Sequence, residues 1–377
     1  MASLSPKSSF HSFSDWCASP GVVARFFPPA RPPRPFAWDG CEQILVIKLD
    51  EIGDFVLVTP FLRELRLNAP RARITLVVKP GVLNLAANCP HVDRVLAYDG
   101  QTKGLRAWQL RRQWRAWRLA RGLRADCAVI PRWGEDAYNA TCLAAYSRSR
   151  AIVAYSEHTT AAKRAMNPGL DRLVSHVVAP SALAHEVEHN LELITAFGGV
   201  VENTALELWP DAADLAFARA TLPDGTGYAA FATGALDPLR RWPVERFAGL
   251  AAVLQQRWGW TPVILGAPGD PVIPGALNLL GRTTLRQATA VLGRCRVLVG
   301  NDSGLLHLAA AAGTRVVEIS GFRAGGDPNH GNSPARFHPW GVAHRVVQPT
   351  PGASVLAVSE VSLAAAQIAC EELLSSP

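Results

Sequence analysis

The chain lacks long apolar runs and closely spaced cysteine pairs, and each absence excludes a class of protein. No apolar run approaches the ~20 residues that a membrane-spanning helix needs, so we do not expect the chain to cross a bilayer. Its seven cysteines include no C-x-x-C pair, which argues against a zinc cluster or a disulfide framework and predicts reduced thiols in a cytoplasm. The net charge of +7 suggests an anionic partner without separating nucleic acid, acidic lipid and phosphorylated glycan.

The length of the chain and the alternation of its apolar and amphipathic segments predict two α/β domains. Its 377 residues exceed what one ordinary core accommodates. Short apolar runs alternate with longer amphipathic stretches, which is typical of parallel sheets covered by helices. Strands are expected at 44–49, 74–78, 94–98, 126–131 and 151–155 in a first sheet and at 228–233, 262–266, 296–300 and 315–320 in a second. Helices are expected at 55–68, 104–121, 138–147, 185–197, 243–258, 284–294, 304–312 and 359–374.

These elements divide the chain into four segments. Residues 1–40 are rich in Ser, Pro and Arg, and their prolines predict a flexible arm. Residues 41–200 are expected to form an N-terminal Rossmann-like domain with an irregular stretch at 156–184, and residues 201–358 a C-terminal one. The helix within residues 359–377 is expected to pack back on the N-terminal domain.

A strand, a glycine turn and a helix are predicted in KLDEIGDFVLVTP, residues 48–60. Gly53 permits a ligand to approach the backbone closely, and Asp54 follows at the start of the helix. Ligands of open α/β sheets bind at the carboxyl ends of the strands, so the Asp54 carboxylate is a candidate for proton transfer. Helix capping is the competing explanation, and locally it is the more common role of an aspartate.

A second strand-turn-helix is predicted in VLVGNDSGLLHLAAAAG, residues 297–313. Asp302, Ser303 and Gly304 would present backbone N–H groups at a helix start, where donors and the helix dipole stabilise a phosphate. A pyrophosphate is a suitable ligand. The alternative is an ordinary capped turn, with His307 a polar residue on the helix.

Two further loops carry groups suited to a nucleotide. After Gly234, the loop presents Arg240 and Arg241, whose guanidinium groups can bind phosphate oxygens bidentately. Asp270 follows the next expected strand, where acids accept hydrogen bonds from ribose hydroxyls in nucleotide-binding folds. Merely solvated surface arginines are the more common explanation of the first loop, and neither loop alone identifies a nucleotide site.

Four segments in this order resemble glycosyltransferase family 9, the lipopolysaccharide heptosyltransferase family. They read ILVIKLDEIGDFVLVTPFLRELR, HEVEHNLELITAFG, RRWPVERFAGLAAVL and VGNDSGLLHLAAAAGT, and the resemblance covers most of residues 42–348. It implies a GT-B fold, in which two Rossmann-like domains face a central cleft. It further implies an ADP-heptose donor, inversion at the anomeric carbon and no metal requirement.

The resemblance implies a role for each matching residue. Asp54 matches the family's general base, which takes the proton of the acceptor hydroxyl. Arg240 stands where the family usually has a lysine that contacts the donor phosphate, and Asp270 where it usually has a glutamate that holds the ribose. The expected donor site also includes Gly234 and the motif that faces the sugar and pyrophosphate: Asp302, Ser303, Gly304 and His307.

The chain contains no D-x-D pair, the carboxylate pattern usual in metal-dependent glycosyltransferases. Cationic side chains and helix N–H groups are therefore expected to stabilise the leaving pyrophosphate in place of a metal ion. No cofactor is expected, because the nucleotide sugar is itself a substrate.

One motif suggests a different enzyme. Residues 185–189 read HEVEH, and on a helix this pattern would place His185 and His189 on one face as zinc ligands, with Glu186 as base. The third histidine of the extended motif is missing, and the resemblance already accounts for the segment. A zinc metalloprotease is therefore a minor alternative.

Residues 103–124 combine eight cationic residues and three tryptophans with no acid, as in a basic amphipathic helix. Such a helix suits an anionic membrane or the phosphates of an acceptor. The equally weighted alternative is a solvated helix whose Trp108, Trp114 and Trp117 pack on the first sheet.

Together these features predict a cytoplasmic glycosyltransferase, with peripheral contact at the inner face of the membrane as an option. The N-terminal domain would bind a glycan or lipopolysaccharide-type acceptor and the C-terminal domain the nucleotide sugar. A nucleotide-sugar epimerase of GT-B architecture is the main alternative. A non-catalytic binder of acidic lipid or nucleic acid is a further one, although nucleic acid is not an expected partner.

Overall fold

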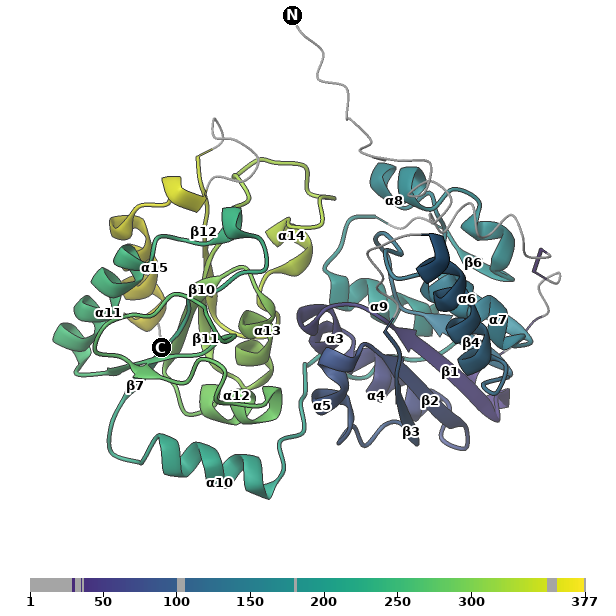
Figure 1. Ribbon diagram of the computed structural model, residues 1–377, viewed down its shortest axis with the longest axis horizontal. Helices are drawn as coiled ribbons and strands as arrows, with labels where there is room; N and C mark the ends of the chain where they lie inside the picture. The colour runs from purple at the N-terminus through teal and green to yellow at the C-terminus, as the bar shows by residue number, and fades with distance from the viewer. Residues whose placement is uncertain are drawn as a thin grey trace, which may run out of the picture. The chain divides into compact units, whose positions relative to one another are not determined.

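The computed structural model groups the chain into two compact units (Figure 1). The described residues are 29–30, 35, 37–99, 106–179, 182–350 and 358–375, with the side chains of 106–112 left out. Most of the predicted N-terminal arm lies outside them. The first unit comprises Met1–Leu49, Ala69–Lys79 and Leu96–Ser181, and the second comprises Asp50–Asn68, Pro80–Val95 and Ala182–Pro377.

The first sheet has six strands in the order β3-β2-β1-β4-β5-β6. β1 lies in the centre, where both neighbours run parallel to it, and every residue of β4 and β5 is buried. Helices α6 and α7 cover a core that includes Leu45, Ile47 and Ala128. The strands are β1 (Gln43–Lys48), β2 (Arg73–Val78), β3 (Arg94–Ala97), β4 (Cys127–Ile130), β5 (Ala151–Tyr155) and β6 (His176–Val178), and the helices are α6 (Arg106–Ala120), α7 (Ala140–Ser147) and α8 (Ala161–Met166).

The second sheet also has six strands, in the order β12-β11-β10-β7-β8-β9. Figure 1 shows α11 and α15 on one side of this sheet and α13 on the other. Helices α11, α12 and α13 begin within one residue of their predicted starts, α15 begins four residues later than predicted, and α14 was not predicted. A capping box at Thr284 begins α12. The strands are β7 (Tyr228–Ala232), β8 (Thr261–Ile264), β9 (Leu277–Asn278), β10 (Val297–Asn301), β11 (Arg315–Ile319) and β12 (His344–Val347), and the helices are α11 (Val244–Trp258), α12 (Leu285–Leu292), α13 (Gly304–Ala311), α14 (Pro334–Phe337) and α15 (Leu363–Ser375).

Five further helices, α3, α4, α5, α9 and α10, group with the second unit. The single helix predicted at residues 55–68 is two helices, because Val58 ends the first and Thr59 begins the second. α10 was not predicted, and its Asp211 forms a capping box with Asp214. The bounds are α3 (Ile52–Leu57), α4 (Thr59–Asn68), α5 (Leu83–Ala86), α9 (Glu186–Thr195) and α10 (Ala212–Thr221). Among the described helices, none has both the length and the apolar character required to cross a membrane.

Three expectations need correction. Residues 156–184 are not irregular, because they contain α8 and β6. Trp38, placed in the flexible arm, lies in the 3-10 helix Trp38–Gly40 and is buried. The C-terminal helix does not have its buried face in the first core: Ala366, Ala369, Cys370 and Leu373 pack in the core of the second sheet. Its alanine-rich face fits closely between α11 and the strands.

The close approach of α3 to α13 explains why residues 50–68 group with the second unit, although they follow β1. A Cβ atom added to Gly304 would lie 2.9 Å from the Cβ of Ile52 and 3.2 Å from the backbone nitrogen of Gly53. A Cβ added to Gly53 would lie 2.6 Å from the Cδ2 of His307. Two glycines therefore permit the two helix N-termini to pack against each other.

We expect Gly304→Ala to lower the free energy of unfolding by about 1–3 kcal/mol, because the added methyl group meets backbone atoms that cannot rotate away. Thermal unfolding by circular dichroism measures this change. Gly81→Ala is the control, because a Cβ at Gly81 meets nothing within 4 Å. Equal melting temperatures for Gly304→Ala and the unmodified protein would contradict this packing.

Candidate active site

Asp54 lies in the first turn of α3, directly after the carboxyl end of β1. The N-cap of α3 is Glu51, so the capping role considered for Asp54 is wrong. Lys48, the last residue of β1, is buried, and its Nζ donates a hydrogen bond to the backbone oxygen of Pro131 at 2.7 Å. Asp54 itself is half-buried. The half-buried carboxylate therefore stands at a helix N-terminus.

The turn before α13 lies against the turn that carries Asp54. Ser303 is the N-cap of α13, but its side chain makes no capping hydrogen bond. Within the described part of the chain, the buried Ser303 Oγ and His307 Nδ1 have no hydrogen-bond partner. The backbone N–H groups at the start of α13 are thus not capped by Ser303 and remain suited to an anion.

Burial and the nearby His338 lower the pKa of His307 to about 4. The His307 ring is 5% exposed and faces the Cα of Gly53, where a methyl group would touch its Cδ2 and Nε2 atoms. His307 is therefore neutral at physiological pH, and it can offer a polar atom to a ligand without adding a positive charge.

Arg240 is bound to the same turn. Its Nη2 lies 2.5 Å from Oδ2 of Asp302 and donates a hydrogen bond to the backbone oxygen of Asp302 at 2.6 Å. Asp237 caps the 3-10 helix Pro238–Arg240 that carries it. The neighbouring Arg241 donates from Nε to the backbone oxygen of Ala235 at 2.9 Å, which holds the loop together. Of the two predicted arginines, Arg240 alone therefore contacts the turn before α13.

Asp270 packs inside its own loop and against Gly234. Its Oδ2 accepts a hydrogen bond from the backbone N–H of Ala267 at 2.7 Å, so loop closure is one of its roles. A Cβ added to Gly234 would lie 2.1 Å from the same oxygen, so the glycine makes room for the carboxylate. Asn301, the last residue of β10, donates to the backbone oxygen of Thr233 at 2.8 Å and joins this loop to the turn before α13.

The nine predicted residues thus lie in one connected region of the second unit. Gly53 and Gly304 join the turns of Asp54 and His307, Arg240 binds Asp302 beside Ser303, and Asn301 links this turn to Gly234 and Asp270. Their roles toward a ligand stay predictions.

Glu318 was missed by the sequence analysis. It lies on β11 in register with Gly300 of β10 and is only 2% exposed, and its Oε2 has no hydrogen-bond partner in the described part of the chain. Burial raises the pKa of Glu318 well above its ordinary value, and the Asp302 carboxylate adds to this rise while Arg240 opposes it. Burial also raises the pKa of Asp302, again against the effect of Arg240. A single acid within the apolar run RVVEIS was the available signal.

We expect Glu318→Gln to stabilise the protein increasingly as the pH rises. A raised pKa means that the folded protein binds this proton more tightly than the unfolded chain does. The unmodified protein therefore loses stability as the pH climbs from about 4.5, the ordinary value, toward the raised one. The amide mimics the protonated acid and avoids this loss, which is about 1.4 kcal/mol for each unit of pKa difference.

Denaturant unfolding of both proteins between pH 5 and pH 9 checks this expectation. Glu245→Gln, at an exposed position on α11, controls for the loss of one carboxylate. A stability difference that is the same at every pH would contradict a protonated Glu318.

The HEVEH motif has a structural role here. His185 is the N-cap of α9 and lies outside the helix, where it forms a capping box with Glu188. Glu186 and Arg336 are both buried and form an ion pair of 2.8 Å, so the acid is bound to a guanidinium. The ring of His185 stacks on Trp340, and burial lowers its pKa to about 3. In the part of the chain that the structure describes, no three His, Cys, Asp or Glu side chains are grouped to hold a metal ion.

Comparison with known proteins shows the family to which this chain belongs. The family model described as "Glycosyltransferase family 9 (heptosyltransferase)" matches residues 132–347, more than half of the chain. This range contains every predicted donor residue and leaves out Asp54. The lipooligosaccharide heptosyltransferase 2 of Haemophilus ducreyi is 25% identical over 284 residues, which is 71% of this chain and 80% of that protein.

Two solved structures share the fold. The glycosyl transferase family 9 protein of Veillonella parvula has a TM-score of 0.69 and 20% identity, and the match covers 91% of this chain and 99% of that one. The ADP-heptose LPS heptosyltransferase II of Escherichia coli has a TM-score of 0.65 and 20% identity, with 88% and 98% covered. These likenesses confirm the predicted α/β GT-B fold with two Rossmann-like sheets.

Proposed function

The chain belongs to glycosyltransferase family 9, and on this premise we propose that it transfers heptose from ADP-heptose to a lipopolysaccharide-core or related glycan acceptor. The contact between the Asp54 turn and the α13 turn is the observation that carries the proposal, because it sets a candidate base beside a candidate phosphate site. The names of the relatives support heptose, an ADP-linked donor and a lipooligosaccharide or lipopolysaccharide product. Membership of the family makes the chain a glycosyltransferase and sets aside the epimerase alternative.

The proposed reaction is a single displacement with inversion. The acceptor hydroxyl oxygen attacks the anomeric carbon and forms the new C–O bond, while Asp54 takes its proton. The bond between this carbon and the pyrophosphate oxygen breaks on the opposite side, and ADP leaves with the electron pair. A base on one face and a leaving group on the other are what inversion requires.

In this proposal Arg240 and the N-terminus of α13 stabilise the leaving ADP. Negative charge grows on the pyrophosphate in the transition state, and oriented N–H donors and a guanidinium lower its energy. Because the sequence has no D-x-D pair, these groups are proposed to act without a metal ion. The donor must compete with Asp302, which forms an ion pair with Arg240.

The remaining assignments are proposals of the same kind. Asp270 would contact the ribose through the oxygen that does not close the loop. Ser303 Oγ and His307 Nδ1 would bind the sugar or the pyrophosphate. The acceptor would be bound by the N-terminal domain, and the cytoplasm is the proposed compartment.

We expect Asp54→Asn to reduce transfer by about 10²-fold or more while ADP-heptose binding is unchanged, because the amide keeps the shape but cannot accept the proton. Glu51→Gln, at the exposed N-cap of the same helix, is the matched control for the loss of one charge. Transfer is followed by mass spectrometry of the acceptor product, and donor binding by calorimetry. Full turnover in Asp54→Asn would exclude Asp54 as the base.

Donor identity is tested separately from the base. Thermal shift of the purified protein against ADP-heptose, other ADP-sugars and UDP-sugars should give the largest increase in melting temperature with ADP-heptose. A larger shift with a UDP-sugar would overturn the proposed donor, and donor consumption that does not depend on acceptor would return the epimerase to consideration.

A further inference from the structure

Over residues 113–120, helix α6 places alanines inside and two tryptophans outside, while the side chain of Trp108 lies outside the described residues. Ala116 and Ala120 are buried in the first core, together with Leu123, just after the helix. Trp114 is 54% exposed and Trp117 is 38% exposed, so they do not pack into the first core as the alternative in the sequence analysis required. An exposed pair of tryptophans is unusual on a helix whose buried face is lined by alanine.

The exposed tryptophans stand among arginines. Arg115, Arg118 and Arg121 are all exposed on the same helix or its last turn. The guanidinium of Arg118 lies 5.4 Å from the ring centre of Trp114, and that of Arg121 lies 4.8 Å from the ring centre of Trp117. We call these five residues the α6 face. It combines apolar rings with cations and contains no acid.

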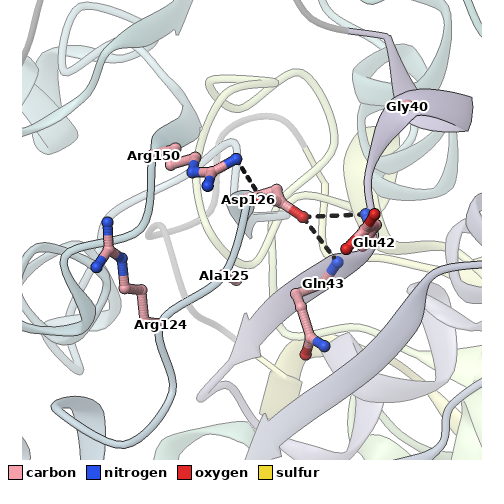
Figure 2. Close-up of a pocket in the computed structure, with 7 residues that line it drawn as sticks. All are labelled: Gly40, Glu42, Gln43, Arg124, Ala125, Asp126 and Arg150. Atoms are coloured by element: carbon pink, nitrogen blue, oxygen red, sulfur yellow. Dashed lines mark hydrogen bonds and ion pairs between the residues drawn. The ribbon is translucent and has the colours of Figure 1, made fainter.

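Two further arginines follow the α6 face in the chain and lie at the amino ends of β4 and β5. There Arg124 and Arg150 line an open pocket of about 450 Å³ (Figure 2). Figure 2 shows Arg150 directed at Asp126, while the guanidinium of Arg124 lies apart from this carboxylate. Asp126 also accepts hydrogen bonds from the backbone N–H groups of Glu42 and Gln43, each at 3.0 Å.

The acids of this region are outnumbered by its arginines. Asp126 is held by Arg150 at 3.1 Å, and the exposed acids nearby are Glu42 and Asp39. Against them stand the arginines of the α6 face, Arg124, Arg148 and Arg150. The pocket itself is lined by two arginines and by the acids Glu42 and Asp126, so the excess of positive charge lies on the α6 face.

We propose that the α6 face docks the protein on an anionic bilayer. Tryptophan favours the boundary between head groups and acyl chains, because its ring is apolar and its N–H is polar. Arginines on the same face bind lipid phosphates. A nucleic acid would also attract the arginines, but a guanidinium already covers one face of each ring that bases would need for stacking.

Vesicle flotation of the full chain, without donor or acceptor, tests this docking independently of the proposed reaction. Vesicles of equal parts phosphatidylglycerol and phosphatidylcholine should bind the protein, and binding should weaken as salt is added. Vesicles of phosphatidylcholine alone should bind it far more weakly. Equal binding to both, or binding to duplex DNA with none to vesicles, would overturn the proposal.

Substitutions then assign the binding to this surface. Replacing Arg115, Arg118 and Arg121 together by Gln should weaken binding to the anionic vesicles about 100-fold, at about five-fold for each cation. The matched control replaces three exposed arginines elsewhere by Gln: Arg71, Arg219 and Arg282. An equal loss in the control would mean that net charge alone drives binding and would overturn the assignment.

Fluorescence quenching by bromine-labelled lipid tests whether Trp114 and Trp117 enter the bilayer. Such lipid should quench tryptophan fluorescence in the unmodified protein, and most of this quenching should disappear in the Trp114→Phe, Trp117→Phe double variant. Phenylalanine keeps enough apolar surface for the variant to stay on the vesicles. Quenching that persists in the bound variant would mean that other tryptophans enter the bilayer.

Discussion

The packing of α3 against α13 through Gly53 and Gly304 is the constraint on which the candidate site depends. A side chain at either position would meet Ile52, His307 or the facing backbone at less than ordinary contact distance. Because both positions are glycine, the two helix N-termini share one small region. The carboxylate of Asp54, the uncapped start of α13 and the ring of His307 are neighbours for this reason alone.

The guanidinium of Arg240 interacts electrostatically with two carboxylates in this region, those of Asp302 and Glu318. Arg240 binds Asp302, and Glu318 lies buried beneath the same turn. With a second charged acid at Glu318, the net charge would be negative where a pyrophosphate is proposed to bind. The raised pKa of Glu318 opposes that second charge, and a neutral His307 leaves Arg240 as the main cation. The charge presented to a donor thus depends on a residue that no ligand need touch.

Much of the fold followed from the sequence because parallel strands in this chain are short apolar runs with clear ends. β5 was predicted to the residue, and the central strands of both sheets within about two residues, whereas the edge strands β6, β9 and β12 were missed. β9 has two residues and β12 no fully buried one, so neither gives a hydrophobic signal. The residues of the site were found by motif, but their contacts were not. Nothing in the spacing of Arg240 and Asp302 says that they form an ion pair, and Glu318 has no motif at all.

For the α6 face, the sequence shows the residue types but not which side of the helix faces the first sheet. A helix rich in Trp and Ala satisfies the hydrophobic pattern in two ways, with either residue type toward the sheet. The space above the first sheet decides between them: Ala116 and Ala120 fit closely against the first core, which leaves the larger rings to solvent. Because Trp114 and Trp117 are exposed, packing of the first core does not account for them. The bilayer proposed above would bury these rings and neutralise the arginines beside them.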